Sequence, residues 1–120
     1  MKKILVVEDN DKNMYMMAFI LAKSGYQVIK AETGELGVEL ALKEMPDLVL
    51  MDIQLPGIDG IEATKKIRAS KADGKIPIVA ITSYAMTGDK ERVMAAGFTG
   101  YIEKPINPDT FMAEVERFIK

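Results

Sequence analysis

The chain has 120 residues, of which 48% are hydrophobic and 28% are charged, and it contains no cysteine and no histidine. This composition predicts one globular domain over residues 1–120 and excludes disulfides, cysteine or histidine zinc sites and a phosphohistidine carrier within the chain. The net charge of -2 supplies no basic field for nucleic acid, and no segment approaches the ~20 apolar residues of a membrane span. The N-terminal run turns acidic too early for a signal peptide, so we expect a cytoplasmic protein without membrane insertion.

The first third of the chain alternates short apolar runs with segments of helical periodicity. Runs of four to six apolar residues bounded by polar loops are typical of buried strands, and apolar residues three and four apart predict helices. The methionines of the first helical segment are interpreted as core filler. In chain order we expect a strand over 4–7, a helix from Asn10 or Asp11 to Gly25, a strand over 26–31 and a helix from Thr33 to Pro46.

The segment 47–60 contains the strand around which the rest is organised. Its apolar run is too short for a helix and is bounded by prolines, which is typical of a strand buried on both faces. Asp52 ends this strand. Because ligands of parallel sheets bind beyond the carboxyl ends of the strands, Asp52 is a candidate for chemistry, the alternative being a polar residue that only ends a strand. Pro56-Gly57 suits a type II turn, and Asp59 with Glu62 predicts a capped helix start.

The remaining elements continue the same alternation. We expect a helix from Asp59 to Arg68, a polar loop over 70–75 and a strand over 77–81. A short helix over 89–96, stopped by Gly97, and a strand over 100–102 with Phe98 should follow. The last helix is expected to have Asn107 as its N-cap and Pro108 as its first residue. Five strand-helix units predict an α/β fold, because parallel neighbours need crossover helices. The expected architecture is a three-layer, flavodoxin-like sandwich with five helices and a five-stranded parallel sheet in the order 2-1-3-4-5.

Three carboxylates are expected to converge at one edge of that sheet. In this strand order the loop with Glu8 and Asp9 lies beside Asp52. Two unit charges ~4 Å apart repel by ~4 kcal/mol at an effective dielectric of about 20, so the cluster must shift its pKa values or bind a cation. Oxygen ligands without histidine or cysteine favour magnesium or manganese. A magnesium ion with few protein ligands exchanges its waters for phosphate oxygens, which indicates phosphoryl chemistry.

Two further strand ends supply complementary groups. Thr82 offers a hydroxyl donor and Lys104 an ammonium. Taken alone, Thr82 could cap a loop and Lys104 could be a solvated surface lysine. Together with Asp52 and a metal, however, they complete what an aspartyl-phosphate site needs.

Four motifs give the sequence a resemblance, over its whole length, to the receiver domains of two-component response regulators: Val7-Glu8-Asp9-Asn10, residues 51–60, Ile81-Thr82 and Tyr101-Ile102-Glu103-Lys104-Pro105. The resemblance implies the same CheY-like fold. It also implies that Asp52 accepts a phosphoryl group from a partner phosphohistidine. Magnesium would then be arranged by Glu8, Asp9, Asp52 and the backbone carbonyl of Gln54, while Thr82 and Lys104 would bind the phosphoryl oxygens.

The resemblance also implies how the signal leaves the site. Phosphorylation would draw Thr82 inward and let Tyr101 turn into the vacated space, although Tyr101 could instead be only a half-buried strand residue. Gln54 and Tyr84 match positions that tune the lifetime of the phosphoryl group, and Lys104-Pro105 matches a cis peptide. The face expected to change is made by the fourth helix, the fifth strand and the fifth helix, with Met86, Lys90, Val93, Met94, Tyr101 and Glu103.

The amino-acid sequences of these motifs are most similar to those of phosphorelay receiver domains. These are single-domain, DivK-like cell-division regulators and receivers fused to hybrid histidine kinases, and the choice between them stays open. We expect a histidine kinase or histidine phosphotransfer protein as phosphoryl donor, a downstream protein as target, and a monomer or weak dimer. The chain ends after the fifth helix, so we expect no output domain, and no enzymatic activity beyond its own phosphorylation and slow dephosphorylation.

Two other functions of the same fold class fit this sequence less well. A flavin-binding module would need a Ser, Thr or Gly loop for the flavin phosphate after the first strand, and here that loop is Glu8-Asp9-Asn10-Asp11, which repels it. An aspartyl phosphatase would need a second acid two residues after Asp52, where this chain has Gln54.

Overall fold

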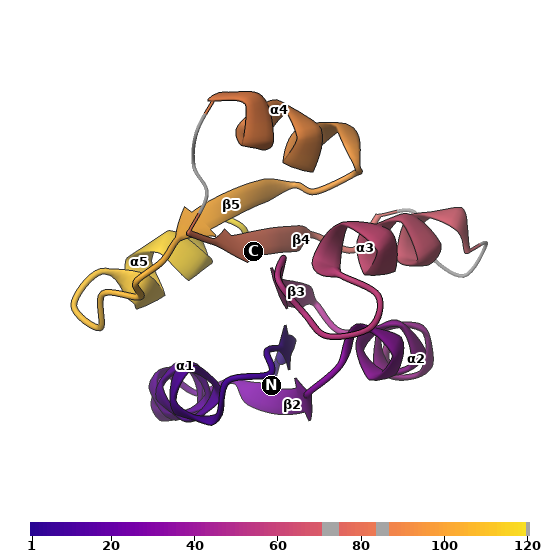
Figure 1. Ribbon diagram of the computed structural model, residues 1–120. Coiled ribbons are helices and arrows are strands. Elements are labelled where there is room, and N and C mark those ends of the chain that lie inside the picture. Colours follow the sequence, from indigo (N-terminus) through magenta and orange to yellow (C-terminus); the bar gives the residue numbers. More distant parts are fainter. Residues whose placement is uncertain (71–74, 84–86, 120) are drawn as a thin grey trace.

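The computed structural model describes residues 1–70, 75–83 and 87–119, with the backbone alone over 87–90. Within these ranges strands and helices alternate strictly (Figure 1). The elements are β1 (Lys3–Val7), α1 (Asp11–Lys23), β2 (Gln27–Ala31), α2 (Gly34–Glu44), β3 (Leu48–Asp52), α3 (Gly60–Ala69), β4 (Ile78–Thr82), α4 (Thr87–Ala95), β5 (Gly100–Glu103) and α5 (Phe111–Glu116).

The strands form one parallel sheet in the order β2-β1-β3-β4-β5, which confirms the predicted fold. Val7 of β1 pairs with Met51 of β3, and Asp52 pairs with Ile81 of β4. Thr82 in turn pairs with Glu103 of β5. The carboxyl ends of four neighbouring strands are therefore level, and the residues that follow them meet at one edge.

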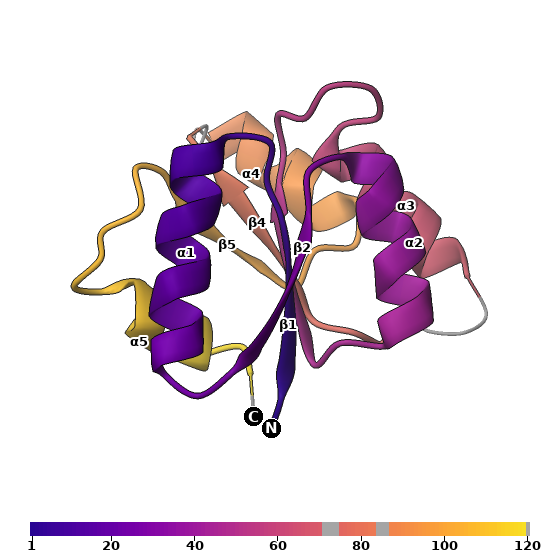
Figure 2. The ribbon, with the colours of Figure 1, turned by 90° about the horizontal axis from the view of Figure 1, so that it is seen from below.

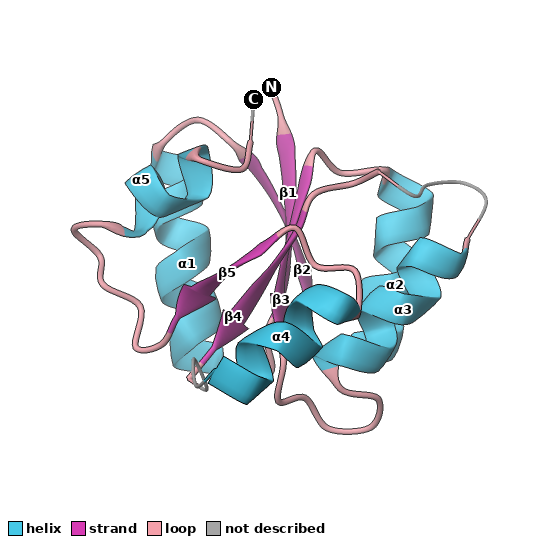
Figure 3. Ribbon diagram, turned by 90° about the horizontal axis from the view of Figure 1, so that it is seen from above, coloured by secondary structure: helices cyan, strands magenta, loops and turns pink. Residues whose placement is uncertain are grey.

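Helices cover both faces of the sheet. α1 and α5 lie on one face and α2 and α3 on the other, and α4 lies toward β5 (Figures 1 and 3). Alternate strand residues enter the two cores because side chains in a strand alternate between faces. Leu5 and Val49 pack in the core with α2, α3 and α4, whereas Ile4 and Leu50 pack in the core with α1 and α5. No described helix has the length and apolar character needed to cross a membrane.

Local signals for the helix starts are largely confirmed. Asn10, rather than Asp11, is the N-cap of α1, and its side chain accepts a hydrogen bond from the Asn13 N–H. Asp59 caps α3 by accepting from the Glu62 N–H at 2.8 Å. Gly57 has a φ of +75°, as the third residue of a type II turn requires.

The regular part of the last helix begins later than predicted, at Phe111 rather than at Pro108. Asn107 caps the turn that leads into α5, because its side chain accepts a hydrogen bond from the Asp109 N–H at 2.9 Å. Its carbonyl oxygen accepts from the N–H groups of Thr110 and Phe111, and α5 begins only at Phe111. Asparagine side chains compete for nearby N–H groups in this way and stabilise turns. Pro108 therefore lies in the turn that precedes the helix.

Two other boundaries also differ from the prediction. α4 begins at Thr87 and ends at Ala95, whereas the sequence predicted residues 89–96. At the end of α4 the Ala96 N–H donates to the carbonyl oxygens of both Arg92 and Val93, so the last turn is narrower than a regular α-helical turn. Phe98 is buried but precedes β5, which begins at Gly100.

Candidate functional site

The site lies at the carboxyl ends of β1, β3, β4 and β5. Asp52 and Thr82 are the last residues of β3 and β4, and Glu8 and Lys104 directly follow β1 and β5. Backbone hydrogen bonding continues past the strand ends, since the Glu8 N–H donates to the Ala31 carbonyl at 3.0 Å and the Lys104 N–H to the Thr82 carbonyl at 2.8 Å. The backbones that hold these side chains are therefore part of the sheet and not of free loops.

Three acidic side chains converge here, as the sequence predicted. Each of Glu8, Asp9 and Asp52 offers a carboxylate oxygen within 4.8 Å of the other two. Glu8 and Asp52 are buried, with exposed fractions of 1% and 3%, whereas Asp9 is exposed. Gln54 is also exposed, and its backbone N–H donates to Asp52 Oδ1 at 3.4 Å.

Lys104 pairs with both buried acids. Its Nζ lies 3.1 Å from Asp52 Oδ1 and 3.3 Å from Glu8 Oε1. Burial disfavours the ammonium, but the hydrogen bond to Asp52 and the charges of both acids outweigh it, so the pKa of Lys104 is raised. The lysine stays protonated and supplies one positive charge against three carboxylates.

The excess of negative charge at the site affects the pKa of Glu8. Burial first, and the charge of Asp52 second, raise the pKa of Glu8 to about 7. Its buried Oε1 accepts no hydrogen bond from the described residues, although Lys104 lies nearby. A buried carboxylate oxygen that accepts no hydrogen bond, beside two other carboxylates, is a suitable ligand for a hard divalent cation. The residues that would hold it are Glu8, Asp9 and Asp52, and the cation would neutralise charge on phosphoryl oxygens.

The first residue of α3 must be small because the helix starts against the site. A Cβ at Gly60 would overlap the Asp52 carbonyl oxygen and lie 2.9 Å from the Ile53 Cα. The Gly60 N–H also donates to the Ile53 carbonyl at 2.9 Å. Gly60 ends the 51–60 motif, but this role was not predictable from the sequence, since close backbone approach leaves no periodic pattern.

Gly60→Ala is therefore expected to lower the free energy of unfolding by ~1–3 kcal/mol, because the backbone after Asp52 must move to admit a methyl group. Urea unfolding measures this loss. Lys65→Ala, in the same helix but exposed, is the control and should change the value by at most ~0.5 kcal/mol. Equal stability of the two variants would contradict the close approach.

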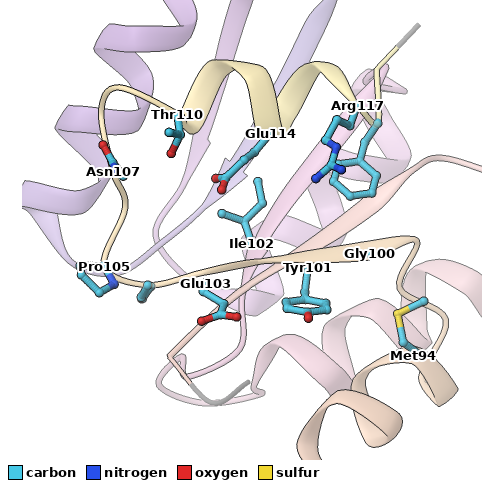
Figure 4. Close-up of a pocket in the computed structure, with 12 residues that line it drawn as sticks. Met94, Gly100, Tyr101, Ile102, Glu103, Pro105, Asn107, Thr110, Glu114 and Arg117 are labelled. Carbon is cyan, nitrogen blue, oxygen red and sulfur yellow. The ribbon is translucent and has the colours of Figure 1, made fainter. Parts of the chain in front are cut away.

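Of the two predicted switch residues, Tyr101 lines a groove between β5 and α5. Thr82 is buried and Tyr101 is half-buried. The groove has a volume of about 680 Å³ and includes Tyr101, Glu103 and Met94. Figure 4 shows Tyr101 and Glu103 projecting from β5; Glu114 of α5 and Arg117, which directly follows α5, also border this groove.

The predicted face needs two corrections. Val93 is only 3% exposed and packs in the core with α2 and α3, so it does not belong to a surface. Glu114 and Arg117 do line the groove but were missed, although their spacing opposite the buried Phe111 and Val115 could have indicated them. Tyr84, Met86 and the Lys90 side chain lie outside the described residues.

A three-layer parallel α/β fold with a buried aspartate, two further acids and a paired lysine at its carboxyl edge defines a class of phosphoryl-accepting signalling domains. The family of response regulator receiver domains matches residues 4–116, and the chain belongs to this family. Its Lys104-Pro105 peptide is cis, as the resemblance implied.

Individual relatives agree with this assignment. The chain is 38% identical over 118 residues to the polar-differentiation response regulator DivK of Brucella ovis, covering 98% of this chain and 96% of that protein. Among solved structures it is similar to the chemotaxis response regulator CheY4 of Vibrio cholerae, with a TM-score of 0.94, 29% identity and 99% of both chains covered.

A third relative bears on the site. The receiver domain of the sensor histidine kinase PA1611 from Pseudomonas aeruginosa PAO1 is 35% identical, with a TM-score of 0.89 and 98% and 96% of the two chains covered. That structure has a magnesium ion coordinated in its active site cleft.

Proposed function

We propose that the chain, as one receiver domain over residues 1–120, accepts a phosphoryl group on Asp52 from the phosphohistidine of a histidine kinase or a histidine phosphotransfer protein. The observation that supports this most is the position of the Asp52 carboxylate, which is 3% exposed, ends the central strand and lies 3.1 Å from the Lys104 Nζ. Receiver domains as a family are signalling modules that work with such kinases and phosphotransfer proteins, and are not conventional enzymes.

In the proposed reaction a carboxylate oxygen of Asp52 attacks the phosphorus atom. The P–N bond to the donor imidazole breaks, its electron pair stays on the imidazole nitrogen, and an acyl phosphate forms. Lys104 and the Thr82 hydroxyl would stabilise the phosphoryl oxygens as the phosphoryl group moves from the imidazole to Asp52. A magnesium ion, or manganese in its place, at Glu8, Asp9, Asp52 and the Gln54 carbonyl would neutralise the same oxygens.

Chemical mapping of the phosphoryl group tests this function. Acetyl phosphate with magnesium should phosphorylate the chain, and a chelator should prevent it. Reduction of the product with borohydride converts an aspartyl phosphate to homoserine, and mass spectrometry of the peptides should locate it at position 52. Modification at another residue, or a rate that is the same with the chelator, would refute the assignment.

The same proposal covers the setting of the protein. The chain would act in the cytoplasm as a monomer or weak dimer, and a downstream protein would read its phosphorylated surface. Gln54 could orient a water toward the acyl phosphate while Tyr84 restricts access, so the lifetime of the phosphoryl group is predicted to depend on both. Neither a single-domain regulator nor a receiver from a hybrid kinase is favoured by the relatives, which include both kinds.

Tyr101 is the proposed coupling residue. Drawing the Thr82 hydroxyl toward a phosphoryl group would vacate space that the ring can enter, and the groove beside β5 would change shape. Tyr101→Ala is therefore expected to reduce the gain in target affinity on beryllofluoride binding to less than about a third of the wild-type gain, because a two-state equilibrium shifts only by differential affinity.

Isothermal titration of the target protein with and without beryllofluoride measures this gain. Tyr101→Phe keeps the ring and is the matched control, so it should retain most of the gain. If Tyr101→Ala keeps the full ratio, the signal leaves the site by another face.

A further inference from the structure

The first turn of α2 contacts two backbone segments that carry the acidic cluster. α2 and α3 lie side by side on one face of the sheet (Figure 2). Gly37 of α2 packs against Val7, which directly precedes Glu8, and a Cβ on this glycine would lie 2.8 Å from Val7 Cγ2. Gly34, the first residue of α2, packs against Ile58, in the turn between β3 and α3. The start of α2 is therefore placed to affect both segments.

The contact between α2 and this turn is between backbones. A Cβ at Gly34 would lie 2.7 Å from the Ile58 carbonyl oxygen and 2.8 Å from Ile58 Cγ1, so the helix start must lack a side chain here. Thr33 caps the same helix start by accepting a hydrogen bond from the Leu36 N–H at 3.1 Å. The first turn of α2 thus forms a defined support for the turn that follows β3.

Glu35 adds a polar contact to this junction. Its Oε2 accepts a hydrogen bond from the Ile58 N–H at 3.3 Å. The same carboxylate lies against Gly57, where a Cβ would be 2.8 Å from Glu35 Oε2. Gly57 has no Cβ and a φ of +75°, so the turn can present its backbone to the carboxylate. Because an ionised acceptor makes a stronger hydrogen bond than a neutral one, Glu35 is well suited to hold the tip of the turn.

The base of the same turn lies in the site. The Gly60 N–H donates to the Ile53 carbonyl at 2.9 Å and closes the turn. Gln54 directly follows this closure, and its N–H donates to Asp52 Oδ1 at 3.4 Å. Only three residues separate Gln54 from Ile58 along the chain, so a displacement of Ile58 must be absorbed by few backbone torsions. The position of the Gln54 backbone therefore depends on what holds Ile58.

We propose that Glu35 is a positioning residue of the magnesium site: its hydrogen bond to the Ile58 N–H holds the turn after β3, and with it the Gln54 carbonyl, in the conformation that binds the ion. The proposal rests on the function proposed above, in which this carbonyl is a magnesium ligand. Glu35 acts through the turn and is not a member of the acidic cluster. Without its hydrogen bond the turn would populate other conformations, and the apparent affinity for the ion falls with the fraction of molecules that are competent to bind.

Glu35→Ala is expected to weaken magnesium binding about fivefold, as for the loss of one hydrogen bond. Titration of the full chain with magnesium chloride at constant ionic strength, followed by amide NMR signals, measures the Kd. Glu35→Gln keeps an oxygen acceptor without the charge and should restore most of the affinity. Glu39→Ala removes an exposed acid one turn further along α2, and its Kd should stay within about twofold of the wild-type value because salt screens exposed charges.

Hydrogen exchange of the Ile58 amide in the magnesium-free chain is the second measurement. It should be at least about threefold faster in Glu35→Ala than in the wild type, and close to the wild-type rate in Glu35→Gln. Urea unfolding should show little loss of stability in either variant, because Glu35 is exposed. This measurement needs neither metal nor phosphoryl group, so it tests the hydrogen bond independently of Asp52.

An unchanged Kd in Glu35→Ala would overturn the proposal even if the exchange were faster, since the carboxylate would then be structural only. Equal weakening by Glu35→Ala and Glu35→Gln would also overturn it, because the effect would then be one of charge. If the wild type itself does not bind magnesium, the metal site proposed above fails and the positioning role fails with it. Faster exchange in Glu35→Ala would then show that the hydrogen bond exists but serves the turn alone.

Discussion

Asp52→Asn is expected to lower the rate of phosphorylation by acetyl phosphate by on the order of 10³-fold or more, because the amide lacks the nucleophilic carboxylate oxygen. The side chain keeps its size, and an amide oxygen can still accept the hydrogen bond from Lys104 that Asp52 Oδ1 accepts at 3.1 Å. Loss of activity would therefore report chemistry and not misfolding. Phosphate incorporation, followed by intact-protein mass spectrometry, measures the rate.

The matched control is Asp109→Asn, which makes the same chemical change at an exposed position in the turn before α5. It should be phosphorylated at the wild-type rate. The free energy of unfolding of Asp52→Asn should not fall in the absence of magnesium, since the substitution removes one of three clustered negative charges. Phosphorylation of Asp52→Asn at the wild-type rate would show that another residue accepts the phosphoryl group.

Magnesium is expected to stabilise the wild type by about 2.7 kcal/mol at a concentration one hundred times its Kd, and Asp9→Ala is expected to remove most of this gain. A ligand that binds only the folded state stabilises it, and Asp9 supplies one of the three carboxylates. Asp9 is exposed, so its truncation opens no cavity in the core. Thermal unfolding with and without magnesium chloride, at constant ionic strength, measures the gain.

Glu39→Gln is the control for charge, because Glu39 is an exposed acid on α2 and lies outside the acidic cluster. It should keep the full magnesium response. The result that would contradict the site is a response of Asp9→Ala equal to that of Glu39→Gln, since any magnesium effect would then be nonspecific screening.

The sequence was sufficient to predict the elements and the sheet order. Buried strands such as 48–52 consist almost entirely of apolar residues. Because these residues are consecutive in the chain, the pattern can be recognised in the sequence alone. Parallel strands joined by crossover helices can be arranged in only a few strand orders. The place of Asp52 and Glu8 at one sheet edge followed from the topology, because strand ends in a parallel sheet are level.

Helix starts were predictable only where one side chain decides them. The Asp59 side chain reaches the Glu62 N–H three residues away, so its cap could be recognised in the sequence. Asn107 has the same chemistry and accepts from the Asp109 N–H, but the regular helix begins only four residues later, at Phe111. Phe111, the first residue of α5, is fully buried, and burial of this kind depends on elements far away in the chain.

By itself, then, the sequence determined the order of elements, the chemical types at the strand ends and the family motifs, because each depends on residues close together in the chain. Only the tertiary structure decided that Lys104 pairs with both Glu8 and Asp52, that Gly60 must lack a side chain, and that Glu35 accepts a hydrogen bond from the Ile58 N–H. These features depend on separations of a few ångströms between elements far apart in the chain. Such separations are set by the packing of whole helices on the sheet, to which many side chains contribute and which no local pattern records.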